Sequence, residues 1–361
     1  MNKLIVNLED KTYPIYITTD FSEFAKILSS RGLGKKVVVI TDENVEKAQW
    51  KSFSEAVQPF GIELSKYVIK AGETHKNLDT VRGIYEFLIT QNLDRKSSLV
   101  ALGGGVVGDI TGFVAATFLR GINFIQVPTT LLSQADSSVG GKVGVDFGGY
   151  KNIIGAFYQP KFVYMNVSAF ETLPQRELRA GLGEVVKHGI IADRDFFDYI
   201  DYNSDRIFSL NPEVLQYLAK VNCQIKSGVV EKDEKEEGLR AILNFGHTIG
   251  HAIETHSKFE LLHGEAIAIG MIGAFKMALK MDMTDTDQLS KVKELLLKLG
   301  LPINYEKMDS EKVLELMYHD KKVKSNKLYF ILPRKIGEVV EIGIDNKDMI
   351  KEVLEELKSV D

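Results

Sequence analysis

The sequence predicts an α/β protein with two domains, in which a doubly wound parallel sheet precedes a domain that is mainly helical. Short β-branched runs alternate with amphipathic helices through roughly the first half of the chain, which favours a parallel sheet. After about Leu173 the hydrophobic periodicity becomes helical nearly to the end. A chain of 361 residues is also too long for one ordinary core. We therefore expect domains of residues 1–173 and 174–361, with a boundary near Thr172-Leu-Pro174.

The individual elements follow from their patterns. The first ten residues indicate a strand that enters a turn, and three apolar runs predict buried strands: Lys36–Thr41, Ser98–Leu102 and Phe124–Pro128. Helical spacing of apolar residues predicts helices over Thr80–Asn92, Ile110–Phe118, Val214–Val230 and Asp287–Leu299. A late exception is a hairpin, predicted from the runs Lys327–Pro333 and Val339–Ile344. The charged run Glu231–Glu237 is interpreted as a solvated loop or helix end.

Composition restricts the classes of function. The contents of 44% hydrophobic and 26% charged residues are typical of a soluble globular protein, and a net charge of −5 gives no sign of nucleic-acid binding. The single cysteine, Cys223, excludes an intrachain disulfide and fits a reducing cytoplasm. The N-terminus lacks the apolar core of a signal peptide, and the longest apolar stretch, Ala266–Phe275, is too short to span a bilayer. We expect a cytoplasmic protein with no nucleic-acid or membrane partner.

A histidine cluster is the most informative feature of the C-terminal half. His247 and His251 are separated by one helical turn and share a helix face, and His263 follows closely. Imidazole is the commonest ligand for zinc, so a metal centre is the first hypothesis. Thr248 stands where the zincin motif HExxH has its catalytic glutamate, which excludes that class. The alternative is a pair of solvated helix histidines. The third histidine and the small residue Gly246 favour the metal centre over this alternative.

A glycine-rich run in the N-terminal half predicts a nucleotide site. Gly103–Gly108 matches GxGxxG and directly follows an apolar strand, with Asp109 next in the chain. Such glycines let the backbone approach a pyrophosphate at a helix N-terminus. The acidic residue expected about twenty positions later is missing, because Arg120 occupies that region, but Asp42 ends an earlier strand and suits a ribose. A structural glycine turn with a capping aspartate remains the alternative.

Basic and carboxylate residues gather around these two motifs. Two glycine-rich segments, Asp136–Lys142 and Gly148–Asn152, are interpreted as loops whose lysines suit a phosphate or carboxylate. Glu184 and Lys187 share one helical face, where the alternatives are a surface ion pair of little energetic value and a third metal ligand beside a lysine. Three more polar residues precede the histidine helix: Lys226, Arg240 and Asn244.

Taken together, the sequence resembles the 3-dehydroquinate synthase family over nearly its whole length. The resemblance rests on several long motifs in the same order: Gly103–Asp109, Asp136–Lys142, Lys151–Pro160, Arg240–His247 and Leu261–Glu265. It implies a Rossmann-like N-terminal domain, a helical C-terminal domain and an active site in the cleft between them. It also implies one NAD and one divalent metal, usually Zn2+ with Co2+ as a substitute, in each subunit of a homodimer.

The resemblance implies roles for particular residues. Glu184, His247 and His263 look like the metal ligands, which removes His251 from the first hypothesis and gives it a role in proton transfer near the substrate phosphate. The implied NAD contacts are Asp42, Glu73, Lys76, Gly105, Val106, Val107, Gly108, Asp109, Thr129, Thr130, Lys142, Lys151 and Thr172. The implied phosphate-side groups are Lys142, Asn152, Lys321 and, from the other subunit, Arg120. Lys187 and Asp136 look like contacts with a substrate hydroxyl. The implied set that binds the substrate carboxylate is Lys226, Arg240 and Asn244.

The activity that the resemblance implies is the conversion of 3-deoxy-D-arabino-heptulosonate 7-phosphate, a phosphorylated sugar acid, to 3-dehydroquinate. The steps are a transient oxidation by NAD, phosphate elimination, re-reduction and an intramolecular aldol closure, within the shikimate pathway to aromatic amino acids. A metal-dependent polyol or alcohol dehydrogenase and a sister sugar-phosphate cyclase are the alternatives. The sequence departs from the family at Gly183, where alanine is frequent, and at His188, where tyrosine is common.

Overall fold

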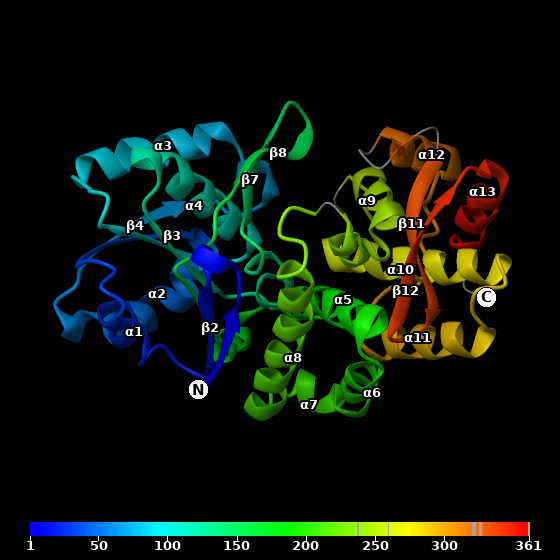
Figure 1. The fold of residues 1–361 in the computed structure, drawn as a ribbon, viewed down its shortest axis with the longest axis horizontal. Helices are drawn as coiled ribbons and strands as arrows, with labels where there is room; N and C mark the ends of the chain where they lie inside the picture. Colours follow the sequence, from blue (N-terminus) through cyan, green and yellow to red (C-terminus); the bar gives the residue numbers. More distant parts are fainter. Residues whose placement is uncertain (237, 259, 320–322, 325–326, 360–361) are drawn as a thin grey trace. The chain divides into compact units, whose positions relative to one another are not determined.

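The computed structural model describes residues 1–236, 238–258, 260–319, 323–324 and 327–359. The chain divides into two compact units (Figure 1). Unit 1 comprises Met1–Leu173 and Leu210–Ser227, and unit 2 comprises Pro174–Ser209 and Gly228–Asp361. A division at Leu173 alone would assign 210–227 to the C-terminal part, whereas their contacts group them with unit 1.

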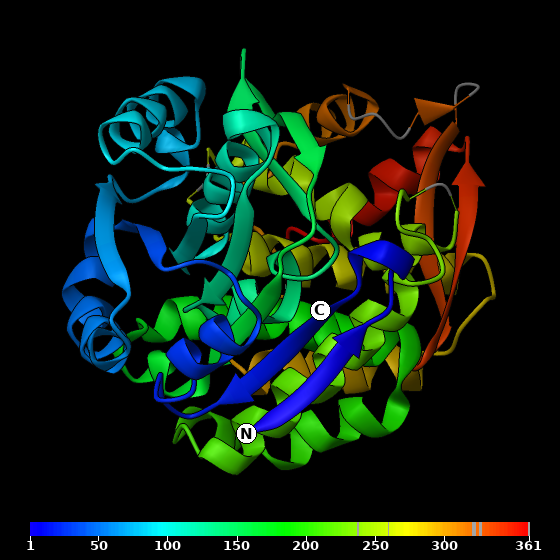
Figure 2. The ribbon, with the colours of Figure 1, turned by 60° about the vertical axis from the view of Figure 1, so that its left-hand side comes forward.

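Unit 1 is built on a seven-stranded sheet in the order β1-β2-β9-β6-β5-β3-β4. The strands are β1 (Asn2–Val6), β2 (Tyr13–Thr18), β3 (Lys36–Asp42), β4 (Glu63–Ile69), β5 (Ser98–Gly103), β6 (Asn123–Pro128) and β9 (Phe162–Asn166). All neighbouring pairs are parallel except β1 and β2, the dark blue strands in Figure 2, which pair antiparallel. The predicted α/β class with a parallel sheet is therefore confirmed, and the three predicted strands are β3, β5 and β6.

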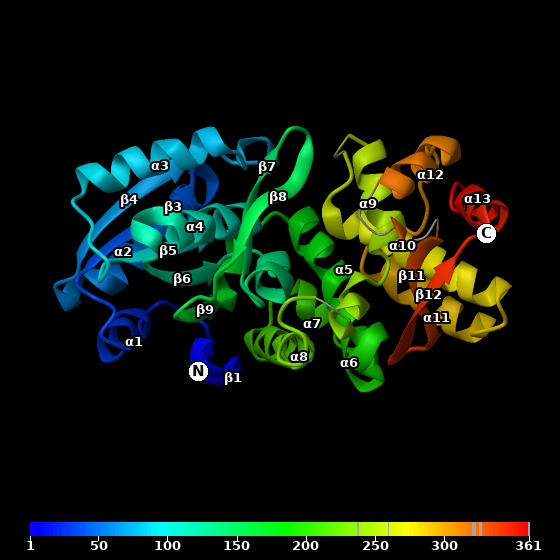
Figure 3. The same cartoon turned by 45° about the horizontal axis from the view of Figure 1, so that its top comes forward.

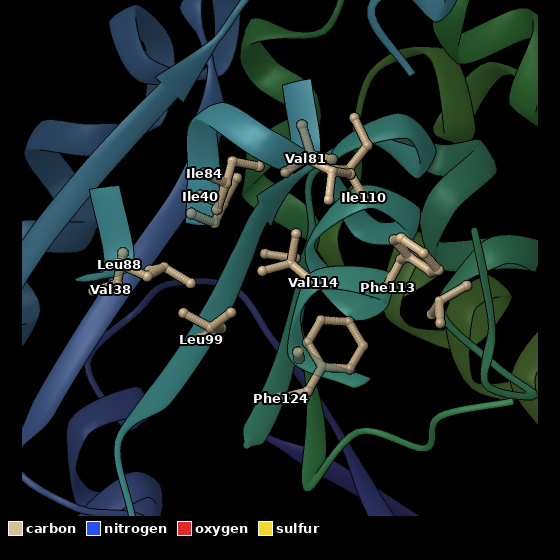
Figure 4. Close-up of a cluster of buried hydrophobic side chains, with 14 of the residues drawn as sticks. Val38, Ile40, Val81, Ile84, Leu88, Leu99, Ile110, Phe113, Val114 and Phe124 are labelled. Atoms are coloured by element: carbon tan, nitrogen blue, oxygen red, sulfur yellow. The ribbon is translucent and has the colours of Figure 1, made fainter. Parts of the chain in front are cut away.

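Helices cover both faces of this sheet, as the alternation of strands and helices predicts. They are α1 (Phe24–Ser30), α2 (Glu43–Val57), α3 (Leu78–Thr90) and α4 (Gly105–Thr117). In Figure 3, α3 and α1 lie on opposite sides of the sheet. Side chains of α3 and α4 form one buried cluster with the sheet, and those of α1 and α2 form a second cluster with its opposite face. In Figure 4, Ile84 of α3 is drawn beside Ile40 of β3, and Val114 of α4 is drawn beside Leu99 of β5. This apolar cluster holds the two helices against the sheet.

Helix α4 begins earlier than the sequence predicts. The expected helix starts at Ile110, but the structure places Gly105–Asp109 inside the helix, so the glycine-rich run supplies the first helical turn. Glycine is needed here for close packing rather than for a wide loop. A Cβ on Gly108 would lie 2.9 Å from Gln126 Oε1 of β6, and one on Gly112 would collide with Val143.

The segment around Lys151 is a hairpin and not the predicted loop. Strand β7 (Lys142–Phe147) pairs antiparallel with β8 (Tyr150–Phe157), and only Gly148 and Gly149 form the turn between them. Both glycines have positive φ, which glycine adopts without a steric cost. Lys151 and Asn152 therefore stand on β8, at the point where its register with β7 shifts between Val145 and Phe147, and Asn152 has a left-handed φ of 51°.

Unit 2 is mainly helical, as predicted. Its helices are α5 (Gln175–Ala192), α6 (Arg194–Tyr202), α7 (Ser204–Phe208), α9 (His247–His256), α10 (His263–Lys280), α11 (Thr286–Lys298), α12 (Ser310–His319) and α13 (Lys347–Glu356). The predicted hairpin is present as β11 (Lys327–Lys335) and β12 (Glu338–Ile344), beside the short β10 (Val323–Lys324). The remaining long helix, α8 (Pro212–Val230), belongs to unit 1 up to Ser227.

Helix α10 is the centre of unit 2, with α5, α9 and β11 packed against it (Figure 1). It contains the apolar stretch Ala266–Phe275, and every one of those residues is buried in the protein. Among the described residues, no helix is both long enough and apolar enough to cross a membrane.

Candidate functional site

Strand β5 leads into α4 through Gly104, and this turn is formed by glycine residues. The N-cap residue Gly104 has no side chain with which to cap the first NH groups of α4. Such groups, together with the helix dipole, attract a phosphate. A Cβ on Gly104 or Gly105 would lie 3.3 Å from Thr130 or 3.2 Å from Ser137, respectively, so a larger residue would narrow this turn.

Five residues predicted for nucleotide or phosphate binding meet beside this turn in unit 1. The Lys76 side chain is only 4% exposed and lies 2.6 Å from Asp109 Oδ2 and 2.5 Å from Asn152 Oδ1. Glu73 Oε1 lies 3.9 Å from the Lys76 ammonium and 3.8 Å from that of Lys151. Burial raises the pKa of Asp109, although the nearby Lys76 opposes the shift. The structure thus brings together three segments that are far apart in sequence.

Other predicted nucleotide contacts have structural partners of their own. Asp42 caps α2 by accepting hydrogen bonds from the backbone NH groups of Asn44 and Val45 at 2.8 and 3.0 Å, as the capping alternative supposes. Its acceptor Oδ1 serves the cap, and the residue remains only partly buried. Thr172 accepts a hydrogen bond from Gln49 at 2.7 Å, in unit 1. Thr130 pairs with Ser133 at 2.9 Å.

Asp136 and Lys226 form an ion pair within unit 1. The Lys226 ammonium lies 2.5 Å from Asp136 Oδ1, with only 6% of the lysine side chain exposed. The family resemblance implies different substrate groups for the two, a hydroxyl and a carboxylate, whereas the structure pairs them. Lys142 and Arg120 are exposed. Leu119 and Arg120 are consecutive residues in the left-handed conformation, with φ values of 51° and 62°.

In unit 2, Glu184 and Lys187 form a buried ion pair on α5. Their side chains are 0% and 1% exposed, so the surface-pair alternative is wrong. Burial by itself would raise the pKa of Glu184, but Lys187 and then His247 hold it well below its usual range. The carboxyl group is therefore ionised at neutral pH.

Two imidazoles, one from α9 and one from α10, face this carboxylate, and a third from α9 lies beside them. His247 Nε2 lies 3.6 Å and His263 Nε2 lies 3.5 Å from Glu184 Oε1. The ring of His251 lies 5.0 Å from that of His247 and 5.7 Å from that of His263. Each of the three histidines offers a nitrogen within 4.8 Å of the other two. The structure thus brings together both predicted ligand sets, with and without His251.

The donor atoms around Glu184 fit a divalent cation. Neither Glu184 oxygen has a hydrogen bond of ordinary geometry among the described residues, although both are buried. A buried carboxylate beside two imidazole nitrogens is a ligand set that zinc accepts, with positions left for substrate oxygens. Burial would lower the pKa of His263, but the nearby carboxylates of Glu184 and Glu254 raise it to about 10. A cation bound there would displace this proton.

The predicted carboxylate-binding residues Arg240 and Asn244 lie on a short 3-10 helix, Leu239–Asn244, in unit 2. Arg240 is 3% exposed, and its Nη1 donates to the carbonyl oxygen of Glu234 at 2.5 Å. Asn244 Nδ2 donates to Glu236 Oε1 at 2.9 Å. Lys321, assigned to the phosphate side, lies outside the described residues.

Two buried residues near the cluster were given no role by the sequence. His188 is fully buried one helical turn after Glu184. Glu254 is 6% exposed and lies seven positions after His247, on the same face of α9. That spacing is the one signal by which the sequence indicates Glu254 as part of the cluster.

Comparison with known proteins first defines a class. The fold matches 2-deoxy-scyllo-inosose synthase, solved in complex with carbaglucose-6-phosphate, NAD+ and Co2+, with a TM-score of 0.90 and 29% identity over 98% of this chain and 100% of the other. The chain therefore has the architecture of a sugar-phosphate cyclase.

The family follows from the sequence comparisons. Residues 66–180 match the model of the 3-dehydroquinate synthase N-terminal region, and 181–323 match that of the C-terminal region. The 3-dehydroquinate synthase of Acetivibrio thermocellus is 61% identical over 99% of both chains. That of Ruminiclostridium cellulolyticum is 56% identical over 98% of this chain and 99% of the relative. The chain belongs to the 3-dehydroquinate synthase family, and it is an enzyme.

Proposed function

We propose that this enzyme converts 3-deoxy-D-arabino-heptulosonate 7-phosphate into 3-dehydroquinate and phosphate. The observation that carries the proposal is the buried Glu184 carboxylate, which faces the Nε2 atoms of His247 and His263. It occurs in a chain that relatives with this activity in their name match almost end to end. The reaction belongs to the shikimate pathway and the biosynthesis of aromatic amino acids.

Each unit has residues that fit one cofactor. In unit 2, Glu184, His247 and His263 would hold a divalent cation, zinc or in its place cobalt. In unit 1, the NH groups at the start of α4 would hold the pyrophosphate of NAD. When bound, NAD would supply reversible hydride transfer, and the cation would supply polarisation of a substrate oxygen.

The protein's own side chains bind, orient and move protons. We assign the carboxylate of the substrate to Arg240 and Asn244, because a guanidinium and an amide supply several hydrogen-bond donors in fixed directions. Lys187, almost fully buried beside Glu184, suits a substrate hydroxyl. We assign proton transfer to His251, since its ring lies at the cluster without being needed as a ligand. We assign Asp136 to a substrate hydroxyl, and Asn152 and Lys142 to the substrate phosphate.

We further propose a homodimer located in the cytoplasm. Support for the dimer is Arg120, an exposed residue that is held in a left-handed conformation directly after another one. Such a conformation is costly for residues other than glycine, and it is more often found at functional positions. We therefore assign Arg120 to the substrate phosphate of the partner subunit. The cytoplasmic location rests on the single cysteine.

A sister cyclase activity is the second candidate, and the likeness to 2-deoxy-scyllo-inosose synthase favours it. The two activities differ in their substrate, because a hexose phosphate carries no carboxylate. The buried guanidinium of Arg240, which donates to the carbonyl oxygen of Glu234, would then lack a substrate anion to balance its charge, and this is costly. Arg240 thus supports the carboxylated heptulosonate.

Phosphate release from two substrates separates these candidates. With NAD and zinc present, we expect kcat/KM for the heptulosonate 7-phosphate to exceed that for glucose 6-phosphate on the order of 1,000-fold or more, because buried polar groups reject a ligand that leaves them unpaired. Release of phosphate is measured for both substrates with the same enzyme preparation. Equal or faster release from glucose 6-phosphate would contradict the proposed substrate and support the sister cyclase.

A further inference from the structure

The two imidazoles that face Glu184 with Nε2 each make a hydrogen bond through the other ring nitrogen, Nδ1. His247 Nδ1 lies 3.0 Å from the carbonyl oxygen of Phe245, which can only accept a hydrogen bond. His263 Nδ1 lies 3.3 Å from Glu254 Oε2. Both contacts require a proton on Nδ1, so Nε2 of each ring is the atom directed toward Glu184, and it becomes available to a cation when it carries no proton.

Glu254 reaches His263 because two helices approach each other closely. It lies on α9 and His263 is the first residue of α10. The helices meet at glycines, since a Cβ on Gly270 would collide with the carbonyl oxygen of Gly246, and one on Gly250 would lie 3.0 Å from that of Ala266. This contact places the carboxylate of Glu254, whose side chain is 9% exposed, against the outer edge of the His263 ring.

We propose that Glu254 is a positioning residue for the metal centre. It accepts the hydrogen bond from His263 Nδ1, fixes the tautomer and the direction of Nε2, and adds a negative charge behind the ligand. Carboxylates in this relation to a ligating histidine raise its basicity and hold its ring, and their loss typically weakens metal binding. The partner of His247 Nδ1 is the main-chain carbonyl of Phe245, which a substitution of the side chain leaves in place. The partner of His263 Nδ1 is the side chain of Glu254, which a substitution can remove. The inference rests on the proposed metal ligands and extends them.

Zinc affinity of the metal-free enzyme tests this role without any assay of turnover. Competition with a chromophoric chelator is measured for the wild type, Glu254→Ala and Glu254→Gln. We expect Glu254→Ala to weaken zinc binding by about 10- to 100-fold, and Glu254→Gln, which keeps an acceptor oxygen but not the charge, by on the order of 10-fold. Glu260→Gln is the matched control, because Glu260 lies in the same unit, is 70% exposed and pairs only distantly with Lys307 at 3.5 Å. This control is expected to keep the wild-type affinity.

A second readout separates positioning from a general loss of stability. The visible spectrum of the cobalt-loaded protein reports ligand geometry, so we expect a changed band for the Glu254 variants and an unchanged one for Glu260→Gln. Should Glu254→Ala not fold, Glu254→Gln alone decides, since it preserves the volume of the side chain. Wild-type zinc affinity and a wild-type cobalt spectrum in Glu254→Gln would overturn the inference. If the wild type itself binds no zinc at Glu184, His247 and His263, the proposed metal centre fails instead.

Discussion

The His247→Ala variant is expected to lose its bound zinc and its activity together. His247 Nε2 is one of two imidazole nitrogens within 3.6 Å of Glu184 Oε1, and the variant would retain only His263 and the carboxylate from the proposed set. A metal that polarises substrate contributes several kcal/mol to catalysis, so we expect kcat to fall by on the order of 1,000-fold or more. Elemental analysis after gel filtration measures the metal, and phosphate release measures the rate.

The His251→Ala variant is the matched control, because His251 lies one turn away on the same helix face. We expect it to retain zinc while its rate falls by about 100- to 10,000-fold, the range for loss of a proton-transfer group. Full zinc occupancy in His247→Ala would contradict the ligand assignment. Zinc lost from His251→Ala but kept in Glu184→Gln would replace Glu184 by His251 in the ligand set.

The Arg240→Ala variant is expected to lose activity far more than stability. The guanidinium is buried at 3% exposure, and its one described hydrogen bond from Nη1 goes to a main-chain carbonyl, that of Glu234. Removing a desolvated partner of the substrate carboxylate costs about 2–5 kcal/mol in transition-state binding, or roughly 30- to 5,000-fold in kcat/KM. The loss is measured by steady-state kinetics with the heptulosonate 7-phosphate.

Two comparisons complete this experiment. Arg194→Ala removes an exposed arginine of the same unit, paired with Asp198 at 2.9 Å, and is expected to leave kcat/KM unchanged. Thermal melting shows whether Arg240→Ala remains folded, and Arg240→Lys tests whether charge alone suffices. If Arg240→Ala folds and retains the wild-type kcat/KM, the carboxylate role is wrong, and the main reason to prefer this substrate over those of the sister cyclases is lost.

Much of the fold could be predicted because hydrophobic periodicity is a local property of the sequence. Strands β3, β5 and β6 appear where their apolar runs predict, and α3, α8 and α11 agree with the predicted helices to within about two residues at each end. The hairpin β7–β8 was not predicted, because its glycines and lysines resemble those of a ligand-binding loop. The start of α4 at Gly105 was also missed, since glycine is a poor helix former and is retained here for close packing against β6.

The candidate site was predictable in its residue types but not in its contacts. The spacing of His247 and His251 indicates a shared helix face, and the structure agrees. The burial of Glu184 and Lys187 depends on how α5 packs against α10, which spacing within α5 does not determine. The ion pair between Asp136 and Lys226, ninety positions apart, likewise arises from tertiary packing. The same holds for Glu254, whose partner His263 lies on another helix.

The most direct test of the proposed activity follows phosphate and NADH in one reaction. The zinc-loaded enzyme receives an excess of the heptulosonate 7-phosphate and less NAD than substrate, while released phosphate and NADH absorbance are recorded together. Because the hydride is returned within each cycle, we expect many phosphates for every NAD and no growth of NADH beyond the amount bound to the enzyme. NADH that accumulates in step with substrate consumption, without release of phosphate, would contradict the account and identify a metal-dependent dehydrogenase instead.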